Sequence, residues 1–136
     1  TRFDRVKAIA DKLEMFPIIE KFIDGQLTFV IGSSWWRDLT IIVPFLNSFG
    51  TPLKTIIAPH EISESEIERL QDVLEKKSIR YSECKTMDLN DTAHLKQLQE
   101  SDVLILDNVG MLAWLYQYAD FAYIGGGFGA GLHNTL

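Results

Sequence analysis

Residues 119–136 read ADFAYIGGGFGAGLHNTL, and this stretch decides the expected fold. The apolar run from Phe121 to Ile124 lies between Asp120 and three consecutive glycines, which indicates a buried strand leading into a glycine-rich loop. In an open α/β sheet such loops follow the carboxyl ends of strands, where backbone N–H groups can approach an anion. The stretch therefore predicts the last strand of an α/β sheet with a ligand-binding crevice at its end.

The chain before this stretch alternates short apolar runs with helical apolar periodicity. The expected strands cover residues 27–31, 54–58, 79–81 (a weak edge strand) and 103–106. The expected helices cover residues 3–13, a short segment from 17 to about 24, 37–49, 63–74, a segment around 95–98, and 111–118. Strands that alternate with helices predict a Rossmann-like, doubly wound parallel sheet in the α/β class.

Two prolines and one serine mark expected helix boundaries. Pro17 can open a second short helix, and Pro44 is expected to kink its helix or to fall within its first turns. Ser63, with Glu66 three residues later, has the spacing of a capping box.

Length, charge and cysteine content limit the class of protein. The 136 residues are enough for one domain with a core of its own. A net charge of −6 argues against a nucleic-acid surface, because such surfaces neutralise phosphates with an excess of basic residues. The single Cys84 cannot form an internal disulfide and fits a reducing compartment. Because no apolar run reaches the roughly 18 residues that span a bilayer, this part of the protein is expected to be soluble.

Small or polar residues follow four of the expected strands. Because parallel strands end at the same edge of a sheet, these four exits are expected to converge on one crevice. The exits are residues 32–34, 59–61, 107–110 and 125–134.

The glycine and serine loops each allow more than one interpretation. Gly125-x-Gly127-x-x-Ala130 matches a loose dinucleotide-binding pattern, but it follows the last strand rather than the first, so a phosphate-binding or close-approach loop is favoured. The glycines can also serve only to permit positive φ in turns. Residues 32–34, Gly-Ser-Ser, can cap the next helix or cradle a phosphate, and no Gly-Lys-Ser/Thr follows as a triphosphate loop would require.

The three histidines do not have metal-binding spacing within one element. His60 and His133 could meet in the crevice, but zinc would need a further ligand such as Glu61 or Asp107, so no metal site is predicted. His94 is expected on a solvated helix face. Asp107 is expected to order its loop rather than to act in catalysis.

Aromatic residues next to the exits have two interpretations. Trp35 and Trp36 could stack on a nucleobase or pack against the core. Trp114 and Tyr116 are expected in the core or at an interdomain surface.

The order of these motifs resembles a known enzyme family. Residues 103–134, VLILDNVGMLAWLYQYADFAYIGGGFGAGLHN, are similar to the C-terminal, donor-binding half of bacterial 3-deoxy-D-manno-octulosonic acid (Kdo) transferases. That family has a strand ending in Asp, a Gly-x-Leu loop, a Tyr-x-x-Ala-Asp segment, a Gly-Gly loop and then His-Asn. Residues 1–4 (TRFD) and 32–35 (GSSW) resemble two earlier segments of the family.

The resemblance implies the C-terminal half of a GT-B glycosyltransferase. Residues 1–136 would be the donor-binding domain, cut at its C-terminal end, with the N-terminal acceptor domain outside this chain. The donor would be CMP-Kdo, the acceptor the lipid A precursor of lipopolysaccharide, and transfer would be inverting, without metal or cofactor. The general base would lie in the other domain, so this chain alone would bind without turnover. The full enzyme would work at the cytoplasmic face of the inner membrane of a Gram-negative bacterium and would contact the membrane only as the full-length protein.

The same resemblance assigns roles to residues of the exits. Gly32, Ser33, Ser34 and the amides of Gly126 and Gly127 would hold the CMP phosphate. Backbone groups of Gly110, Met111 and Leu112 would contact cytidine, and His133 and Asn134 would orient the phosphate or ribose. His60 is a departure, because many family members read Pro-Arg-His where this chain reads Pro-His-Glu.

Two other functions are compatible with the sequence. One is a GT-B transferase or epimerase that uses a UDP-sugar, and the other is a non-catalytic doubly wound domain that binds nucleotides or regulates another protein.

Overall fold

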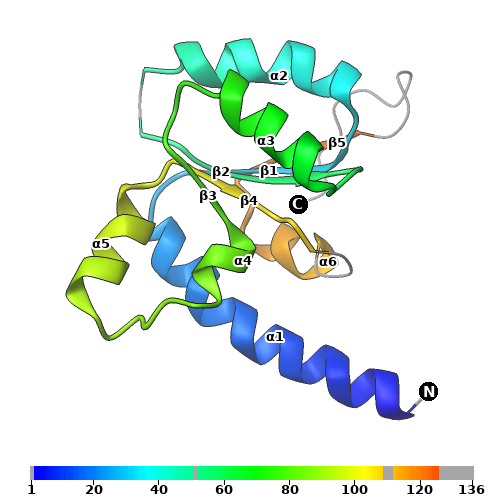
Figure 1. The fold of residues 1–136 in the computed structure, drawn as a ribbon, viewed down its shortest axis with the longest axis vertical. Helices are drawn as coiled ribbons and strands as arrows, with labels where there is room; N and C mark the ends of the chain where they lie inside the picture. Colours follow the sequence, from blue (N-terminus) through cyan, green and yellow to red (C-terminus); the bar gives the residue numbers. More distant parts are fainter. Residues whose placement is uncertain (1, 51, 109–111, 126–136) are drawn as a thin grey trace.

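The computed structural model describes residues 2–50, 52–108 and 112–125, which form one five-stranded sheet (Figure 1). All four strand pairs are parallel, and the strand order is β3-β4-β2-β1-β5. The strands are β1 (Thr28–Ser34), β2 (Lys54–Pro59), β3 (Ser78–Arg80), β4 (Val103–Ile105) and β5 (Phe121–Ile124). The fold is therefore α/β, Rossmann-like and doubly wound, as the sequence predicts.

Helices cover both faces of the sheet (Figure 1). The α2 face carries α2 (Trp36–Ser48) and α3 (Glu64–Val73). The α1 face carries α1 (Arg2–Ile23), α4 (Tyr81–Cys84), α5 (Thr92–Glu100), α6 (Leu112–Leu115) and the 3₁₀ turn η1 (Tyr116–Tyr118). No helix within the described residues is both long enough and apolar enough to cross a membrane.

Neighbouring residues of the central strands point to opposite faces, and both faces are buried. Val30, Ile56 and Leu104 are aligned across β1, β2 and β4 and belong to the core under α1. The residues that follow them, Ile31, Ile57 and Ile105, belong to the core under α2 and α3. Burial on both faces explains why these strands show no polar alternation in the sequence.

The expected break at Pro17 is wrong, because α1 is continuous from Arg2 to Ile23. A proline inside a helix costs about 3 kcal/mol. The same helix buries Met15, Ile19 and Phe22 completely on the sheet, and each such side chain contributes about 1.5–3 kcal/mol. Packing on both sides of the proline therefore outweighs the lost hydrogen bond.

Two other local predictions need correction. Helix α3 begins after Ser63 as expected, but the Ser63 side chain makes no capping hydrogen bond. Instead its Oγ lies 3.4 Å from Oγ of Ser65. The helix expected over residues 111–118 is shorter, because α6 gives way to η1 within the part that the structure describes.

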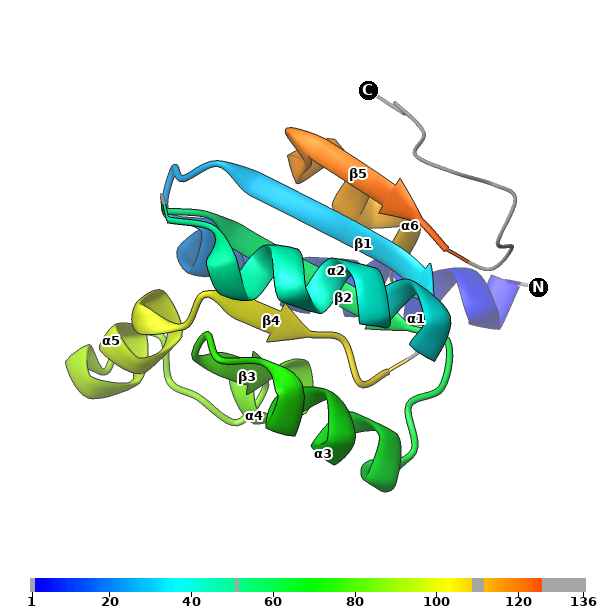
Figure 2. The same cartoon turned by 90° about the horizontal axis from the view of Figure 1, so that it is seen from above.

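Among the described connections, those that leave the carboxyl ends of β2 and β4 go to opposite faces of the sheet. Strand β2 leads to α3 on the α2 face, whereas its neighbour β4 leads to α6 on the α1 face. Figure 2 shows β1, β4 and β5 pointing toward the same edge of the sheet. In open α/β sheets, ligands bind outside this edge where the connections part.

Candidate functional site at the carboxyl edge of the sheet

The ends of three neighbouring strands are joined by backbone hydrogen bonds. The N–H of His60, after β2, donates to the carbonyl of Ser34 at the end of β1, with an N–O distance of 2.7 Å. The N–H of Gly125, after β5, donates to the carbonyl of Gly32 at 2.8 Å. Three of the four predicted exits are thus contiguous in the described part of the edge.

The last residues of β1 have an irregular backbone. The pairing of β1 with β2 shifts between Ile31 and Ser34, and Ser33 has a φ of 51°. A non-glycine residue in this left-handed region costs on the order of 1–3 kcal/mol, and such residues cluster at functional sites. The bulge turns the end of β1 away from the regular ladder.

Ser34 does not cap α2, so the capping interpretation of the serine loop is wrong. The N-cap residue is Trp35, whose N–H donates to Oδ2 of Asp38 at 2.8 Å. Ser34 is 2% exposed, and its Oγ has no hydrogen-bond partner among the described residues. A buried hydroxyl without a partner is rare and expensive.

Asp38 joins the ends of β1 and β5. Its Oδ1 accepts a hydrogen bond of 2.8 Å from the Tyr123 hydroxyl, while its Oδ2 accepts from Trp35. The bond to Asp38 and burial both raise the pKa of Tyr123, with the hydrogen bond as the larger cause. A Cβ atom at Gly125 would lie 2.6 Å from Oδ2 of Asp38 and 2.8 Å from the carbonyl oxygen of Ser33, so only glycine fits this approach.

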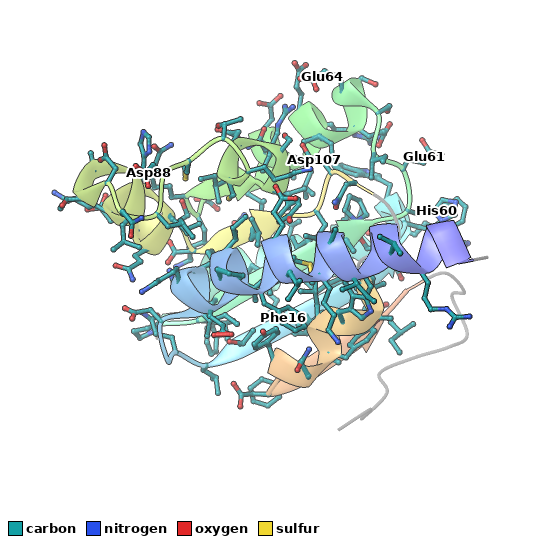
Figure 3. All side chains as sticks on the ribbon, turned by 90° about the horizontal axis from the view of Figure 1, so that it is seen from below. Phe16, His60, Glu61, Glu64, Asp88 and Asp107 are labelled. Carbon is teal, nitrogen blue, oxygen red and sulfur yellow. The ribbon has the colours of Figure 1, made fainter. Side chains whose placement is uncertain are left out.

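The rings of Trp35 and His60 stack on each other outside the edge. Their centroids are 3.7 Å apart and their planes are inclined by 19°. Trp35 is 37% exposed and His60 is also exposed. In Figure 3, His60 lies beside Glu61 at the end of the molecule opposite to Asp88. The stack is a surface feature of the site and not part of the core.

Asp107, after β4, orders a loop as expected. Its carboxylate accepts hydrogen bonds from the backbone N–H and the hydroxyl of Ser82, in α4. This ties the exit of β4 to the segment that follows β3.

Gly32 and Leu112 lie together. A Cβ atom at Gly32 would lie 2.1 Å from Oη of Tyr116 and 3.0 Å from Cδ2 of Leu112. Both covering side chains, like that of Trp114, pack against the core of the α1 face. Gly32 therefore provides room for this packing, while its carbonyl accepts the hydrogen bond from Gly125.

The remaining predicted donor-binding residues lie outside the described residues. They are Gly110, Met111, Gly126, Gly127, His133 and Asn134.

A pocket of about 150 Å³ opens between α2 and α3 beside these exits. It is lined by Ser34, Trp35, Trp36, Leu39, Pro59, His60, Glu61, Glu66, Arg69 and Leu70. Within the described ranges, no three His, Cys, Asp or Glu side chains are grouped so that they could hold a metal ion.

Two residues of the site, Asp38 and Arg69, are absent from the sequence-based prediction. Asp38 occupies the third position of its helix, where an acidic side chain commonly bonds back to the N-cap, so helix-start rules could have identified it. No local pattern could have shown its second bond, to Tyr123, which is 85 residues away. Arg69, on α3, stacks on Trp36 of α2, and no sequence pattern indicated its place in the site.

An α/β Rossmann-like domain with its polar and aromatic groups at the carboxyl edge is the class that fold and site define. Over 109 residues, or 79% of its length, the chain is 30% identical to a protein from Chlamydophila psittaci (strain ATCC VR-125 / 6BC) named 3-deoxy-D-manno-octulosonic acid transferase. The match covers 23% of that protein, so the chain spans less than a quarter of this relative. The chain matches no protein-family model and no solved structure. The similarity supports a distant relationship to Kdo transferases and, at most, a glycosyltransferase-like function.

Proposed function

We propose that this chain is the donor-binding, C-terminal domain of a two-domain GT-B glycosyltransferase that transfers Kdo from CMP-Kdo to the lipid A precursor. The observation that carries the proposal is the meeting of the β1, β2 and β5 exits at one edge in a chain similar to a Kdo transferase. Donor nucleotides in Rossmann-like domains bind at this edge, because strand ends and helix starts offer N–H groups there.

In the proposed reaction a hydroxyl oxygen of the acceptor attacks the anomeric carbon of Kdo. The bond from that carbon to the phosphate oxygen breaks, and CMP leaves with the electron pair. A carboxylate of the acceptor domain takes the hydroxyl proton. The work of this domain is to hold the leaving phosphate and to stabilise its charge, for which Ser34 offers an unused donor.

In this proposal, residues at the same edge would hold the nucleotide. Ser33 and Ser34 would bind the phosphate together with the backbone of Gly126 and Gly127, and His60 would lie beside them. By the resemblance, Gly110, Met111 and Leu112 would contact cytidine while His133 and Asn134 orient the ribose or phosphate. The full enzyme would act at the cytoplasmic face of the inner membrane.

Titration of the 136-residue chain with CMP, UMP and NAD tests the proposal. Tryptophan fluorescence is a suitable signal because Trp35 and Trp36 line the pocket at the edge. We expect CMP-selective binding with a dissociation constant on the order of 1 mM, since only one side of the cleft is present. A preference for UMP would favour a UDP-sugar enzyme, and binding of NAD alone, or an equal response to all three, would contradict the assignment.

A further inference from the structure

The pocket between α2 and α3 is lined by a cationic side chain, Arg69. The guanidinium carbon of Arg69, on α3, lies 3.6 Å from the centre of the Trp36 ring, on α2. Arg69 forms no ion pair and no hydrogen bond with any residue that the structure describes. Stacking holds the plane of the guanidinium in place and leaves its five N–H donors open to a ligand.

A second unused donor lines the same pocket. Ser34 Oγ is buried, lacks a partner among the described residues, and comes from β1 rather than from a helix. The imidazole of His60 forms another wall and is held against Trp35. Three elements therefore bring donor groups of three kinds, a guanidinium, a hydroxyl and an imidazole, to one small space.

The size and charge of the pocket indicate which kind of ligand it can bind. The pocket, of about 150 Å³, has room for an oxyanion. Glu61 and Glu66 also line the pocket, so binding there weakens with each further negative charge on an anion. One guanidinium beside two carboxylates suits a singly charged oxyanion that carries hydroxyl groups, because carboxylates accept hydrogen bonds from hydroxyls.

We propose that Arg69, Ser34 and His60 form a subsite for one oxyanion of the sugar-nucleotide donor, with Arg69 as its charged anchor. This inference rests on the proposed function and adds a residue to it. The oxyanion is either the carboxylate of the sugar acid or the phosphate of the nucleotide. Arginine suits both, since its planar fork pairs with two oxygens at once. In this chain the guanidinium is that of Arg69 on α3, and the residue after β2 is His60, which contributes an imidazole.

The test compares Arg69→Gln with Lys96→Gln in the 136-residue chain. Lys96 is on α5, its side chain is 72% exposed, and its loss changes the net charge equally. Binding of CMP, free Kdo and cytidine is followed by NMR titration, because the Arg69 change itself alters Trp36 emission. We expect Arg69→Gln to weaken binding of the oxyanion source about tenfold and Arg69→Lys to weaken it less. Cytidine binding should not change, and Lys96→Gln should behave as wild type.

The pattern of losses identifies the source and separates the two proposals. Weaker binding of Kdo alone assigns the carboxylate to Arg69, and weaker binding of CMP alone assigns the phosphate. If wild type binds CMP or Kdo while Arg69→Gln binds as tightly as Lys96→Gln, the subsite is wrong and the proposed function stands. If wild type binds neither, both are wrong, and if it binds Kdo through Arg69 without CMP, only the nucleotide assignment falls.

Ser34→Ala is a second variant that does not alter charge. We expect several-fold weaker binding together with unchanged or higher thermal stability, because the wild-type hydroxyl is buried without a partner. A purely structural role for Ser34 would instead lower stability, and weaker binding that merely followed such a loss would contradict the subsite.

Discussion

Removal of the Asp38 carboxylate should loosen the contact between the ends of β1 and β5. Asp38 is 3% exposed and accepts one hydrogen bond from the Trp35 N–H and one from the Tyr123 hydroxyl, each 2.8 Å long. In Asp38→Ala both donors lose their partner while they remain in a partly buried place. The variant therefore tests whether this single side chain fixes the geometry of the edge.

The expected loss follows from the two bonds. A hydrogen bond to a charged group contributes about 1.5–3 kcal/mol, and partial exposure of Tyr123 places this pair near the lower limit. We therefore expect Asp38→Ala to lower the free energy of unfolding by about 3 kcal/mol, and the melting temperature by about 10 °C for a chain of this size. Tyr123→Phe should cost about half as much, because only one bond is lost.

Urea unfolding of the two single variants and of the double variant measures the coupling. The double-mutant cycle should give an interaction energy of about 1 kcal/mol or more between Asp38 and Tyr123. Asp72→Ala, an exposed carboxylate on α3, is the matched control and should change stability by less than about 0.5 kcal/mol.

An alkaline titration gives independent evidence on the same bond. Asp38 raises the pKa of Tyr123, so the folded state keeps the phenol proton at a pH where the unfolded state loses it. The stability from this bond is therefore complete below pH 10 and is lost as pH rises through the folded pKa. In Asp38→Ala the phenolate absorbance assigned to Tyr123 should appear at lower pH. Additive single variants, or an unchanged phenol titration, would refute the reasoning.

Three further predictions follow from the described contacts. Gly32→Ala should lower the free energy of unfolding by about 1–3 kcal/mol in urea unfolding, because the new methyl group would clash with Oη of Tyr116. Adding Tyr116→Phe should restore part of this loss. Gly50→Ala is the control and should be neutral, because a Cβ atom there would meet open space. Lys54 is 1% exposed and burial lowers its pKa, so wild type should gain stability relative to Lys54→Met as pH rises from the folded pKa to 10.5, and equal pH profiles of the two proteins would contradict this. Cys84 is buried, and burial raises the pKa of its thiol from 9.0 to about 12, so its thiolate fraction is about a thousandfold below that of an exposed thiol. A thiol reagent should therefore label Cys84 only upon unfolding. Rapid labelling of the folded chain would contradict this prediction.

The sheet was predictable from sequence because its central strands are buried on both faces. Residues 103–106 contain only aliphatic side chains, and the structure places Val103 and Leu104 on opposite faces of β4, each in contact with a core. The strand order was not predictable, since β4 pairs with β2 through contacts between residues almost 50 positions apart, such as Ile56 with Leu104. Such pairings depend on which helices fit each face and leave no local pattern.

The sequence predicted that the strand exits lie together, but it did not indicate the helix residues beside them. A run of small or polar residues after each strand indicates the edge, because parallel strands share it. Ser34 and His60 were identified in this way, and the structure joins them by a backbone bond. Asp38 and Arg69 lie on helices, where a charged residue usually belongs to a solvated face. Only the packing of α2 and α3 on the sheet turns these two side chains toward the edge.

The strained end of β1 connects the fold to the proposed chemistry. The left-handed conformation of Ser33 lowers the stability of the fold, and Ser34 has a buried hydroxyl without a partner among the described residues. In a chain selected only for stability, glycine at position 33 and alanine at position 34 would remove these two destabilising features. The Asp38 bonds to Trp35 and Tyr123 hold this end in place in spite of its cost. A donor held in place by a rigid backbone needs no reorganisation when charge develops on a ligand, which is the arrangement that a leaving phosphate requires.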